Sequence, residues 1–223
     1  MTTQHLRPQL QLALDHTRLD AALATTALLH PHVDIIEAGT ILCISEGIQA
    51  VKTLRQLYPH HTLVADLKVA DAGATLAQQA FSAGANWMTV ICAAPLATMS
   101  AALEVAKQHD GDIQIELFGH WTLNDAKNWR DLGITQAIYH RGRDAQASGQ
   151  SWSQADLERM QALSDLGIEL SVTGGITPAD LPLFHAIAVR AFIVGRALSE
   201  AKHPVATATA TAFHHAIDAI WGK

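Results

Sequence analysis

Cysteine is scarce in this chain of 223 residues, where Cys43 and Cys92 are the two present and no C-x-x-C spacing occurs. Two distant cysteines do not form a disulfide framework, so we expect a reducing compartment. Long apolar runs are also missing, since no segment approaches the ~20 apolar residues that a membrane-spanning helix needs. The first residues, Met1–Pro8, lack the apolar stretch of a signal peptide. These absences predict a cytoplasmic protein that contacts no membrane.

Positive charge is the next shortage. The formal net charge is -6, and lysines and arginines form no run. A nucleic-acid partner requires a basic surface, so none is expected. The chain has 13 histidines, but no H-x-x-x-H pair has a third ligand close in sequence, so we expect no zinc site.

What the chain does have is an even alternation of short apolar runs and amphipathic stretches, with 49% hydrophobic and 16% charged residues. The apolar runs predict strands at Gln9–Leu14, Val33–Glu37, Thr62–Leu67, Trp87–Ile91, Ile113–Leu117, Gln136–Tyr139, Glu169–Val172 and Phe192–Val194. Helical spacing predicts helices at Leu19–Leu29, Ile44–Leu57, Ala72–Ala83, Pro95–His109, Asn124–Leu132, Asp156–Leu166 and Val205–Trp221. Thr177-Pro178 has the composition of a helix N-cap and first turn.

This alternation indicates the fold. Strands that are apolar nearly throughout are typical of parallel strands buried on both faces. Eight of them, alternating with helices, indicate right-handed βαβ units. We therefore predict an α/β fold, a (β/α)8 TIM barrel, as a single domain over residues 1–223. An open doubly wound sheet is the rival, but no glycine-rich turn follows the first predicted strand.

The stretch from Val64 to Asp71 carries the densest chemical signal. An apolar strand runs directly into two carboxylates and one ammonium, in the pattern D-x-K-x-x-D. Asp66 and Lys68 are two residues apart, so in an extended segment their side chains leave on the same face. A lysine between two aspartates stays protonated and keeps the carboxylates ionised. Charges assembled at a strand end usually serve chemistry.

Other polar residues also follow predicted strands. In a barrel the chemistry lies at the carboxyl ends of the strands, so these side chains are expected to meet at one mouth. In strand order they are Asp15, Glu37, Asp66 with Lys68, Glu116, His140 with Arg143 beyond it, Thr173-Gly174-Gly175, and Gly195-Arg196.

Two ligand sites follow from this arrangement. Barrels bind phosphate with the loops after strands seven and eight, where glycine lets backbone amides approach the oxygens, so Val172–Thr177 and Ile193–Arg196 predict a phosphate site. Glu37 and Asp66 end adjacent strands, and two such carboxylates suit Mg²⁺. The alternative is that one carboxylate pairs with Lys68 and no metal binds. His140 either moves a proton near neutral pH or only caps its strand.

The collected residues resemble the 3-keto-L-gulonate-6-phosphate decarboxylases of the orotidine-5′-monophosphate decarboxylase superfamily. The resemblance covers almost the whole chain. D-x-K-x-x-D marks the superfamily, whereas H-R-x-R-D-A-Q-A is more discriminating. The segments that carry the resemblance are Ala13–Asp15, Ile36–Thr40, Ala65–Asp71, Tyr139–Ala147, Val172–Gly175 and Val194–Arg196.

The resemblance implies a homodimer of barrels with shared active sites, in which Asp71 reaches into the partner's site. It implies Mg²⁺ held by Glu37 and Asp66, with the substrate completing the coordination shell. It also implies that the phosphate of a sugar substrate is held by Thr173, Gly175, Gly195 and Arg196. One departure is His120, where the family pattern has tyrosine.

The expected reaction is decarboxylation of a β-keto sugar acid phosphate, which leaves an enediolate. The cation and Lys68 would offset its charge. Asp15 and Glu116 would position substrate hydroxyls. His140 and Arg143 would direct the protonation that gives a pentulose phosphate.

Three alternatives remain. The sister family, hexulose-6-phosphate synthase, joins formaldehyde to ribulose 5-phosphate through the same enediolate, and Arg143 is the main discriminator. Orotidylate decarboxylation needs no metal, so Glu37 beside Asp66 counts against it. The third is a non-catalytic phosphosugar-binding barrel, such as a metabolite sensor, but the sequence shows no DNA-binding helix pair, basic patch or appended effector domain to support it.

Overall fold

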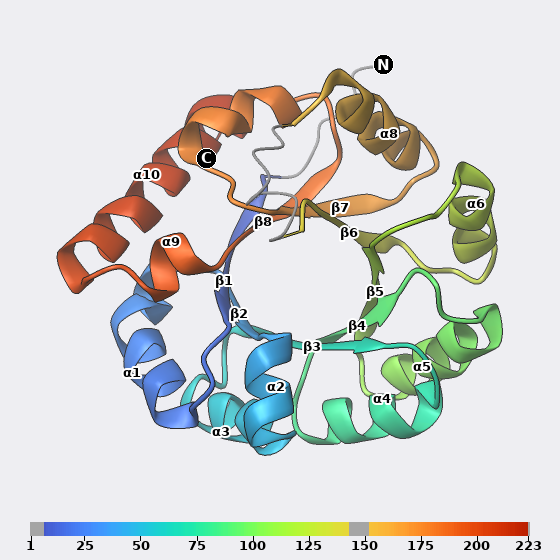
Figure 1. The fold of residues 1–223 in the computed structure, drawn as a ribbon, viewed down its shortest axis with the longest axis horizontal. Coiled ribbons are helices and arrows are strands. Elements are labelled where there is room, and N and C mark those ends of the chain that lie inside the picture. The colour runs from blue at the N-terminus through green and yellow to red at the C-terminus, as the bar shows by residue number, and fades with distance from the viewer. Residues whose placement is uncertain (1–6, 143–151, 223) are drawn as a thin grey trace.

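The computed structural model describes residues 7–142 and 152–222, and its strands close into a parallel barrel (Figure 1). Neighbours in the barrel are neighbours in sequence, and the last strand pairs with the first. The predicted (β/α)8 barrel is therefore confirmed. The strands are β1 Gln9–Leu14, β2 Ile35–Ala38, β3 Thr62–Val69, β4 Trp87–Ile91, β5 Asp112–Leu117, β6 Gln136–His140, β7 Glu169–Thr173 and β8 Val189–Val194.

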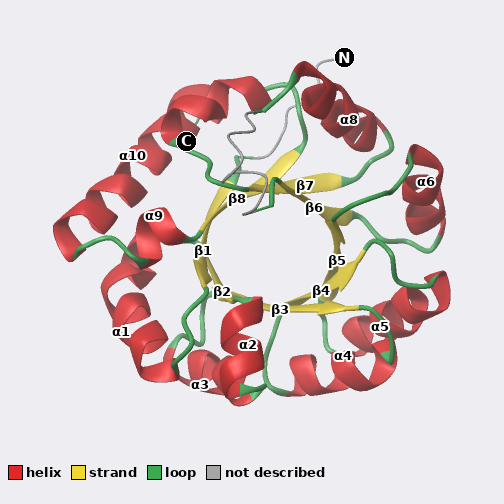
Figure 2. Ribbon diagram, in the orientation of Figure 1, coloured by secondary structure: helices red, strands yellow, loops and turns green. Residues whose placement is uncertain are grey.

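A ring of helices surrounds the barrel, as Figure 2 shows. Within the described ranges no helix is both long and apolar enough to cross a membrane. The α-helices are α1 Leu19–Leu29, α2 Thr40–Glu46, α3 Gln49–Leu57, α4 Gly73–Ser82, α5 Leu96–Gln108, α6 Leu123–Asp131, α8 Gln154–Asp165, α9 Arg196–Ser199 and α10 His203–Trp221. Two 3-10 helices, η1 His30–His32 and η2 Pro178–Phe184, complete the set in the part of the chain described.

One helix prediction needs correction, and the N-cap predicted at Thr177-Pro178 is confirmed at the start of a 3-10 helix. The single helix expected over Ile44–Leu57 is two helices, α2 and α3, because Gly47 between them has φ 64°, outside the helical region. After Thr177 the chain does form a capping box with Asp180, but the segment that follows is the 3-10 helix η2, with Pro182 inside it. A proline in a helix interior removes a backbone donor, so a regular α-helix is disfavoured there.

The core has the layers expected of a barrel. Most buried apolar side chains lie between the strands and the helices. Inside the barrel, one small cluster contains Ile35, Val64, Trp87 and Ala191, and a separate one contains Ala13, Ile138 and Ile193. A packed interior of this kind closes the barrel from within, which leaves its carboxyl-end mouth as the place for a site.

Candidate active site

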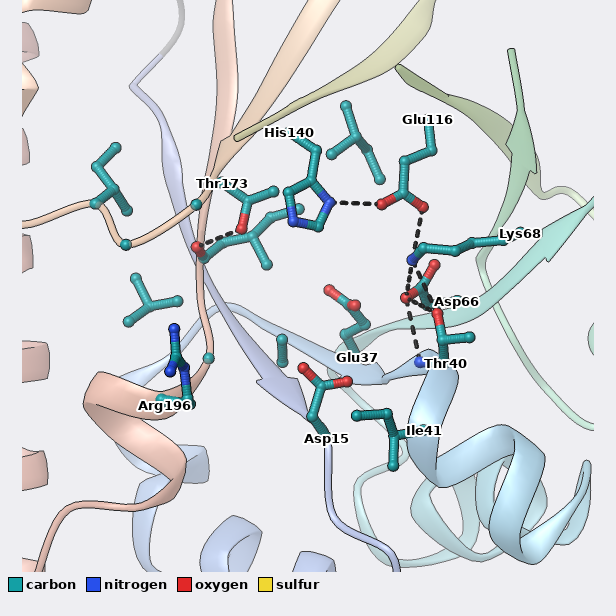
Figure 3. Close-up of a pocket in the computed structure, with 18 of the residues that line it drawn as sticks. Asp15, Glu37, Thr40, Ile41, Asp66, Lys68, Glu116, His140, Thr173 and Arg196 are labelled. Atoms are coloured by element: carbon teal, nitrogen blue, oxygen red, sulfur yellow. Dashed lines mark hydrogen bonds and ion pairs between the residues drawn. The ribbon is translucent and has the colours of Figure 1, made fainter. Parts of the chain in front are cut away.

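A cavity of about 410 Å³ opens at the carboxyl ends of the strands. Ten of the predicted site residues line it: Asp15, Glu37, Asp66, Lys68, Glu116, His140, Thr173, Gly175, Gly195 and Arg196. Figure 3 shows Thr173 and Arg196 on one side and the group Asp66, Lys68 and Glu116 on the opposite side. The sequence therefore predicted correctly which strand ends come together.

Two predicted site residues are not in this cavity lining. Asp71 is exposed and lies outside the group that lines it. Its reach into a partner subunit stays a prediction. Arg143 falls outside the residues that the structure describes, so its role as discriminator also stays a prediction.

Lys68 is the electrostatic centre of the site. Its Nζ lies 2.6 Å from Asp66 Oδ2, 2.8 Å from Glu116 Oε2 and 2.8 Å from Thr40 Oγ1. Burial lowers the pKa of Lys68, but Asp66 and Glu116 outweigh that effect and raise it above its usual value. Lys68 is therefore a fixed positive charge at neutral pH.

The sequence interpretation of this cluster was partly wrong. Lys68 pairs with Asp66 and Glu116, whereas it was expected to lie between Asp66 and Asp71. Nor does it continue an extended strand, because its φ is 47°, in the left-handed region. The two side chains do meet, as predicted. They meet at a point where the backbone leaves the extended conformation, which the alternation of a regular strand does not predict.

Asp66 is a carboxylate held on both oxygens. Its Oδ1 accepts from Thr89 Oγ1 at 2.8 Å, and its Oδ2 accepts from Thr40 Oγ1 at 2.5 Å as well as from Lys68. Burial alone raises the pKa of Asp66, but Lys68 and the two threonine hydroxyls bring it below its ordinary value. Asp66 thus stays ionised in a buried position. Sequence reasoning did not single out either threonine.

Glu37 lies on β2 beside Asp66, and the pKa of its carboxyl is shifted in the opposite direction. Its side chain is 6% exposed, and Gln11 Nε2 donates to its Oε2 at 2.5 Å. Burial, followed by the charges of Asp66 and Asp15, raises the pKa of Glu37 well above its ordinary value. A buried carboxylate facing two others is unfavourable unless a cation joins them.

This donor set fits a magnesium ion. Across the two described ranges, no group of three or more His, Cys, Asp or Glu side chains has the arrangement to hold a metal without help. Mg²⁺, however, is usually bound by one or two carboxylates together with substrate oxygens and water. Glu37 and Asp66 supply two such carboxylates, and both line the cavity, where further oxygen ligands could come from water or a bound molecule.

In a protein stripped of divalent cations, Glu37→Gln is expected to raise the melting temperature. Because the folded pKa of Glu37 lies above its unfolded value, wild-type stability is greatest below the unfolded pKa and falls as pH rises through the folded one. Glutamine has nearly the same shape and no charge to desolvate. Since about 1 kcal/mol moves the melting temperature of a chain of this size by about 2–4 °C, we expect a rise of at least ~2 °C in EDTA near pH 8.

Scanning fluorimetry of both proteins in EDTA and in Mg²⁺ measures this effect. Mg²⁺ should stabilise the wild type more than the variant, since Glu37→Gln removes the charge of one of the two carboxylates expected to hold the ion. A variant no more stable than the wild type in EDTA would contradict the cost that we assign to ionising the buried Glu37 carboxyl.

His140 and Glu116 form a second ionisable pair. His140 Nδ1 lies 2.8 Å from Glu116 Oε1, while the other carboxylate oxygen faces Lys68. Burial raises the pKa of Glu116, although its bonds to His140 and Lys68 act in the opposite direction. In Figure 3 the second ring nitrogen of His140 points away from Glu116 and into the cavity. That nitrogen is placed to exchange a proton with a bound molecule.

The loops after β7 and β8 form the wall opposite Lys68. Gly174 has φ 118°, and a Cβ there would lie 2.3 Å from the backbone oxygen of Arg141, so no other residue fits without a shift of the backbone. Arg141 Nε donates to Gly174 O at 2.9 Å, and its Nη2 donates to Gly175 O at 3.4 Å. The carbonyls of this turn are therefore tied outward to Arg141. The sequence analysis did not predict this contact, because nothing in the sequence distinguishes Arg141 from its neighbours after His140.

Known proteins similar to this chain belong to the family that its motifs resemble. Residues 8–211 match the model of the orotidine 5'-phosphate decarboxylase / HUMPS family. The chain is 65% identical over 216 residues to the 3-keto-L-gulonate-6-phosphate decarboxylase SgbH of Escherichia coli, covering 97% of each chain.

Solved structures agree. The crystal structure of 3-keto-L-gulonate-6-phosphate decarboxylase from Vibrio cholerae has a TM-score of 0.92 at 51% identity and covers 97% of this chain and 100% of that one. The 3-hexulose-6-phosphate synthase from Salmonella typhimurium has a TM-score of 0.86 at 28% identity and covers 94% and 98%.

Proposed function

We propose, from the premise that this chain belongs to the orotidine 5'-phosphate decarboxylase / HUMPS family, that it converts 3-keto-L-gulonate 6-phosphate to L-xylulose 5-phosphate and CO₂. The family resemblance seen in its motifs is confirmed. Named relatives at high identity are decarboxylases, and the chain is an enzyme of that class, a carboxy-lyase, as its motifs predicted.

One observation carries the proposal. Glu37, Asp66, Lys68, Glu116 and His140 form a continuous set of charged or ionisable groups along one side of the cavity, and the two glycine loops lie across from it. Such a cavity suits a substrate with a phosphate at one end and an oxygen-rich reacting group at the other. A purely structural role would not require so many buried charges in one place.

Loss of CO₂ from a β-keto acid with a hydroxyl on its α carbon leaves an electron pair that delocalises onto the ketone oxygen, which gives an enediolate. Lys68 is the permanent cation nearest to Asp66, so it would stabilise the developing negative charge. Asp15 and Glu116 would accept hydrogen bonds from substrate hydroxyls and fix the orientation of the sugar. The phosphate would lie against Thr173, Gly175, Gly195 and Arg196.

Glu37 and Asp66 would hold the Mg²⁺. When bound, the ion would supply positive charge that offsets the negative charge left by the loss of CO₂. The two carboxylates differ in their environment, since Asp66 accepts from four donors, on Lys68, Thr89 and the side chain and backbone of Thr40, and Glu37 accepts from Gln11. We expect Asp66 to fix the position of the ion and Glu37 to complete the negative charge around it.

The last step is protonation of the enediolate carbon. His140, oriented by Glu116, would deliver this proton directly or through a water molecule. Arg143, predicted to act with it, lies outside the described residues. Two further proposals come from the sequence: a homodimer in which Asp71 enters the partner's site, and a location in the cytoplasm.

A second candidate is the formaldehyde aldol reaction of hexulose-6-phosphate synthases. The observation in its favour is the 28% identity to a solved synthase. The identity to a named decarboxylase is higher, at 65%. Both reactions use an enediolate, so the charged side of the cavity serves either one.

Product identification by NMR separates the two. We expect L-xylulose 5-phosphate to accumulate from 3-keto-L-gulonate 6-phosphate, and ribulose 5-phosphate with formaldehyde to react much more slowly at equal enzyme concentration. Efficient hexulose phosphate formation without pentulose phosphate from the keto acid would reject the proposal in favour of the aldol reaction.

A further inference from the structure

The backbone of β3 is irregular where the site begins. Its pairing with β4 is regular through Ala65↔Met88 and resumes at Val69↔Val90. Between these pairs β3 advances four residues and β4 advances two, so β3 contains a bulge. Asp66 and Lys68 both lie within this bulge, and Lys68 has the left-handed φ of 47° there. L-residues disfavour that conformation, so something must hold it.

Thr89 on β4 is the residue opposite the bulge. Its Oγ1 accepts a hydrogen bond from the backbone N–H of Lys68 at 2.8 Å. The same hydroxyl donates to Asp66 Oδ1 at 2.8 Å. Thr89 thus supplies, with its side chain, the bond that the regular ladder cannot give to Lys68, and it joins the two charged residues of the bulge.

Water cannot take the place of the Thr89 hydroxyl, because the side chain is fully buried. Thr89 is 0% exposed, so bulk water does not reach it. It is also absent from the residues that line the cavity, so it does not contact the substrate. A hydroxyl is the one small group that can accept from an amide and donate to a carboxylate at once.

We propose that Thr89 is a positioning residue, which sets the direction of the Asp66 carboxylate and of the Lys68 ammonium by fixing the backbone of the bulge. The inference rests on the proposed function, because it assigns Thr89 to the decarboxylation carried out at Asp66 and Lys68. The phosphate loops are on the far side of the cavity, so Thr89 acts on the reacting end of the substrate alone.

Thr89→Val, which has the same shape without the hydroxyl, tests this. Loss of a group that orients metal ligands typically costs about 10- to 100-fold in activity or metal affinity, and we expect such a fall in kcat. KM for the phosphosugar and inhibition by inorganic phosphate should stay near wild-type values. The Mg²⁺ concentration for half-maximal activity should rise, because Asp66 is no longer oriented.

Two control variants accompany it. Thr89→Ser keeps the hydroxyl and should restore most of the activity. Thr26 in α1 is also 0% exposed, and its Oγ1 donates to Ala22 O at 2.7 Å, away from the cavity. Thr26→Val therefore removes an equally buried hydroxyl, and it should leave kcat and the Mg²⁺ requirement unchanged.

Hydrogen exchange gives a readout independent of turnover. The Lys68 amide should exchange faster in Thr89→Val than in the wild type, while amides in β4 and β5 keep their protection. A Thr89→Val enzyme about as active as the wild type, an inactive Thr89→Ser, or an unchanged Lys68 amide would each overturn the inference. A wild type without decarboxylase activity would instead reject the proposed function, and the exchange result would still decide whether Thr89 holds the bulge.

Discussion

Asp66→Asn is expected to reduce kcat/KM by about 10³-fold or more, the largest loss from any single substitution in this site. The change removes the charge that pairs with Lys68 at 2.6 Å and one of the two carboxylates proposed to hold Mg²⁺. The single amide oxygen of asparagine can keep the bond that Thr89 donates to Oδ1 or the bond that Thr40 donates to Oδ2, so the local hydrogen bonds survive only in part. We therefore expect the missing charge of Asp66 to account for most of the lost activity.

The fold should tolerate the substitution. Lys68 keeps Glu116 and Thr40 as partners, so no buried ammonium is left without one. Asp20, exposed and paired with Arg18, offers a matched control, and Asp20→Asn should have wild-type activity. Steady-state kinetics and circular dichroism of both variants measure the outcome. A folded Asp66→Asn enzyme with near-wild-type turnover would show that Asp66 has no part in catalysis.

His140→Asn is expected to lower kcat by about 10²-fold while KM changes little, because a positioned proton donor typically contributes 10²- to 10⁴-fold. The imidazole is held by Glu116 at 2.8 Å, so the two residues should act as a unit. Glu116→Gln should be the more damaging change, since Glu116 also pairs with Lys68. The double variant should then be no slower than Glu116→Gln alone.

A double-mutant cycle over these kinetics is the measurement. His109, exposed beside Phe81, is the histidine control, and His109→Asn should not alter kcat. Fully multiplicative effects of His140→Asn and Glu116→Gln would mean that Glu116 does not orient His140 for proton transfer.

Much of the site was predictable from the sequence, because in a barrel the carboxyl ends of all strands lie around one mouth. Once eight apolar strands are recognised, the residues after each one are known to meet at one mouth. Asp15 and Glu116 are 101 residues apart in sequence, yet they line the same cavity for this reason. The glycine pair after β7 was recognisable because few other residues adopt its backbone conformation.

The rest depends on contacts that no local pattern encodes. The bulge in β3 arises from its pairing with β4, so the left-handed backbone of Lys68 and the role of Thr89 could not be inferred from Val64–Asp71 alone. The pairing of Lys68 with Glu116 joins β3 to β5 and was hidden for the same reason. The break between α2 and α3 did have a signal, Gly47, which the helical spacing on both sides concealed.

Release of CO₂ from 3-keto-L-gulonate 6-phosphate, measured with Mg²⁺ and with EDTA, tests the central claim most directly. We expect release in Mg²⁺, its loss in EDTA, and its recovery when Mg²⁺ is added in excess. Release that EDTA does not diminish would contradict the magnesium site at Glu37 and Asp66. No release under either condition would contradict the decarboxylation of this substrate.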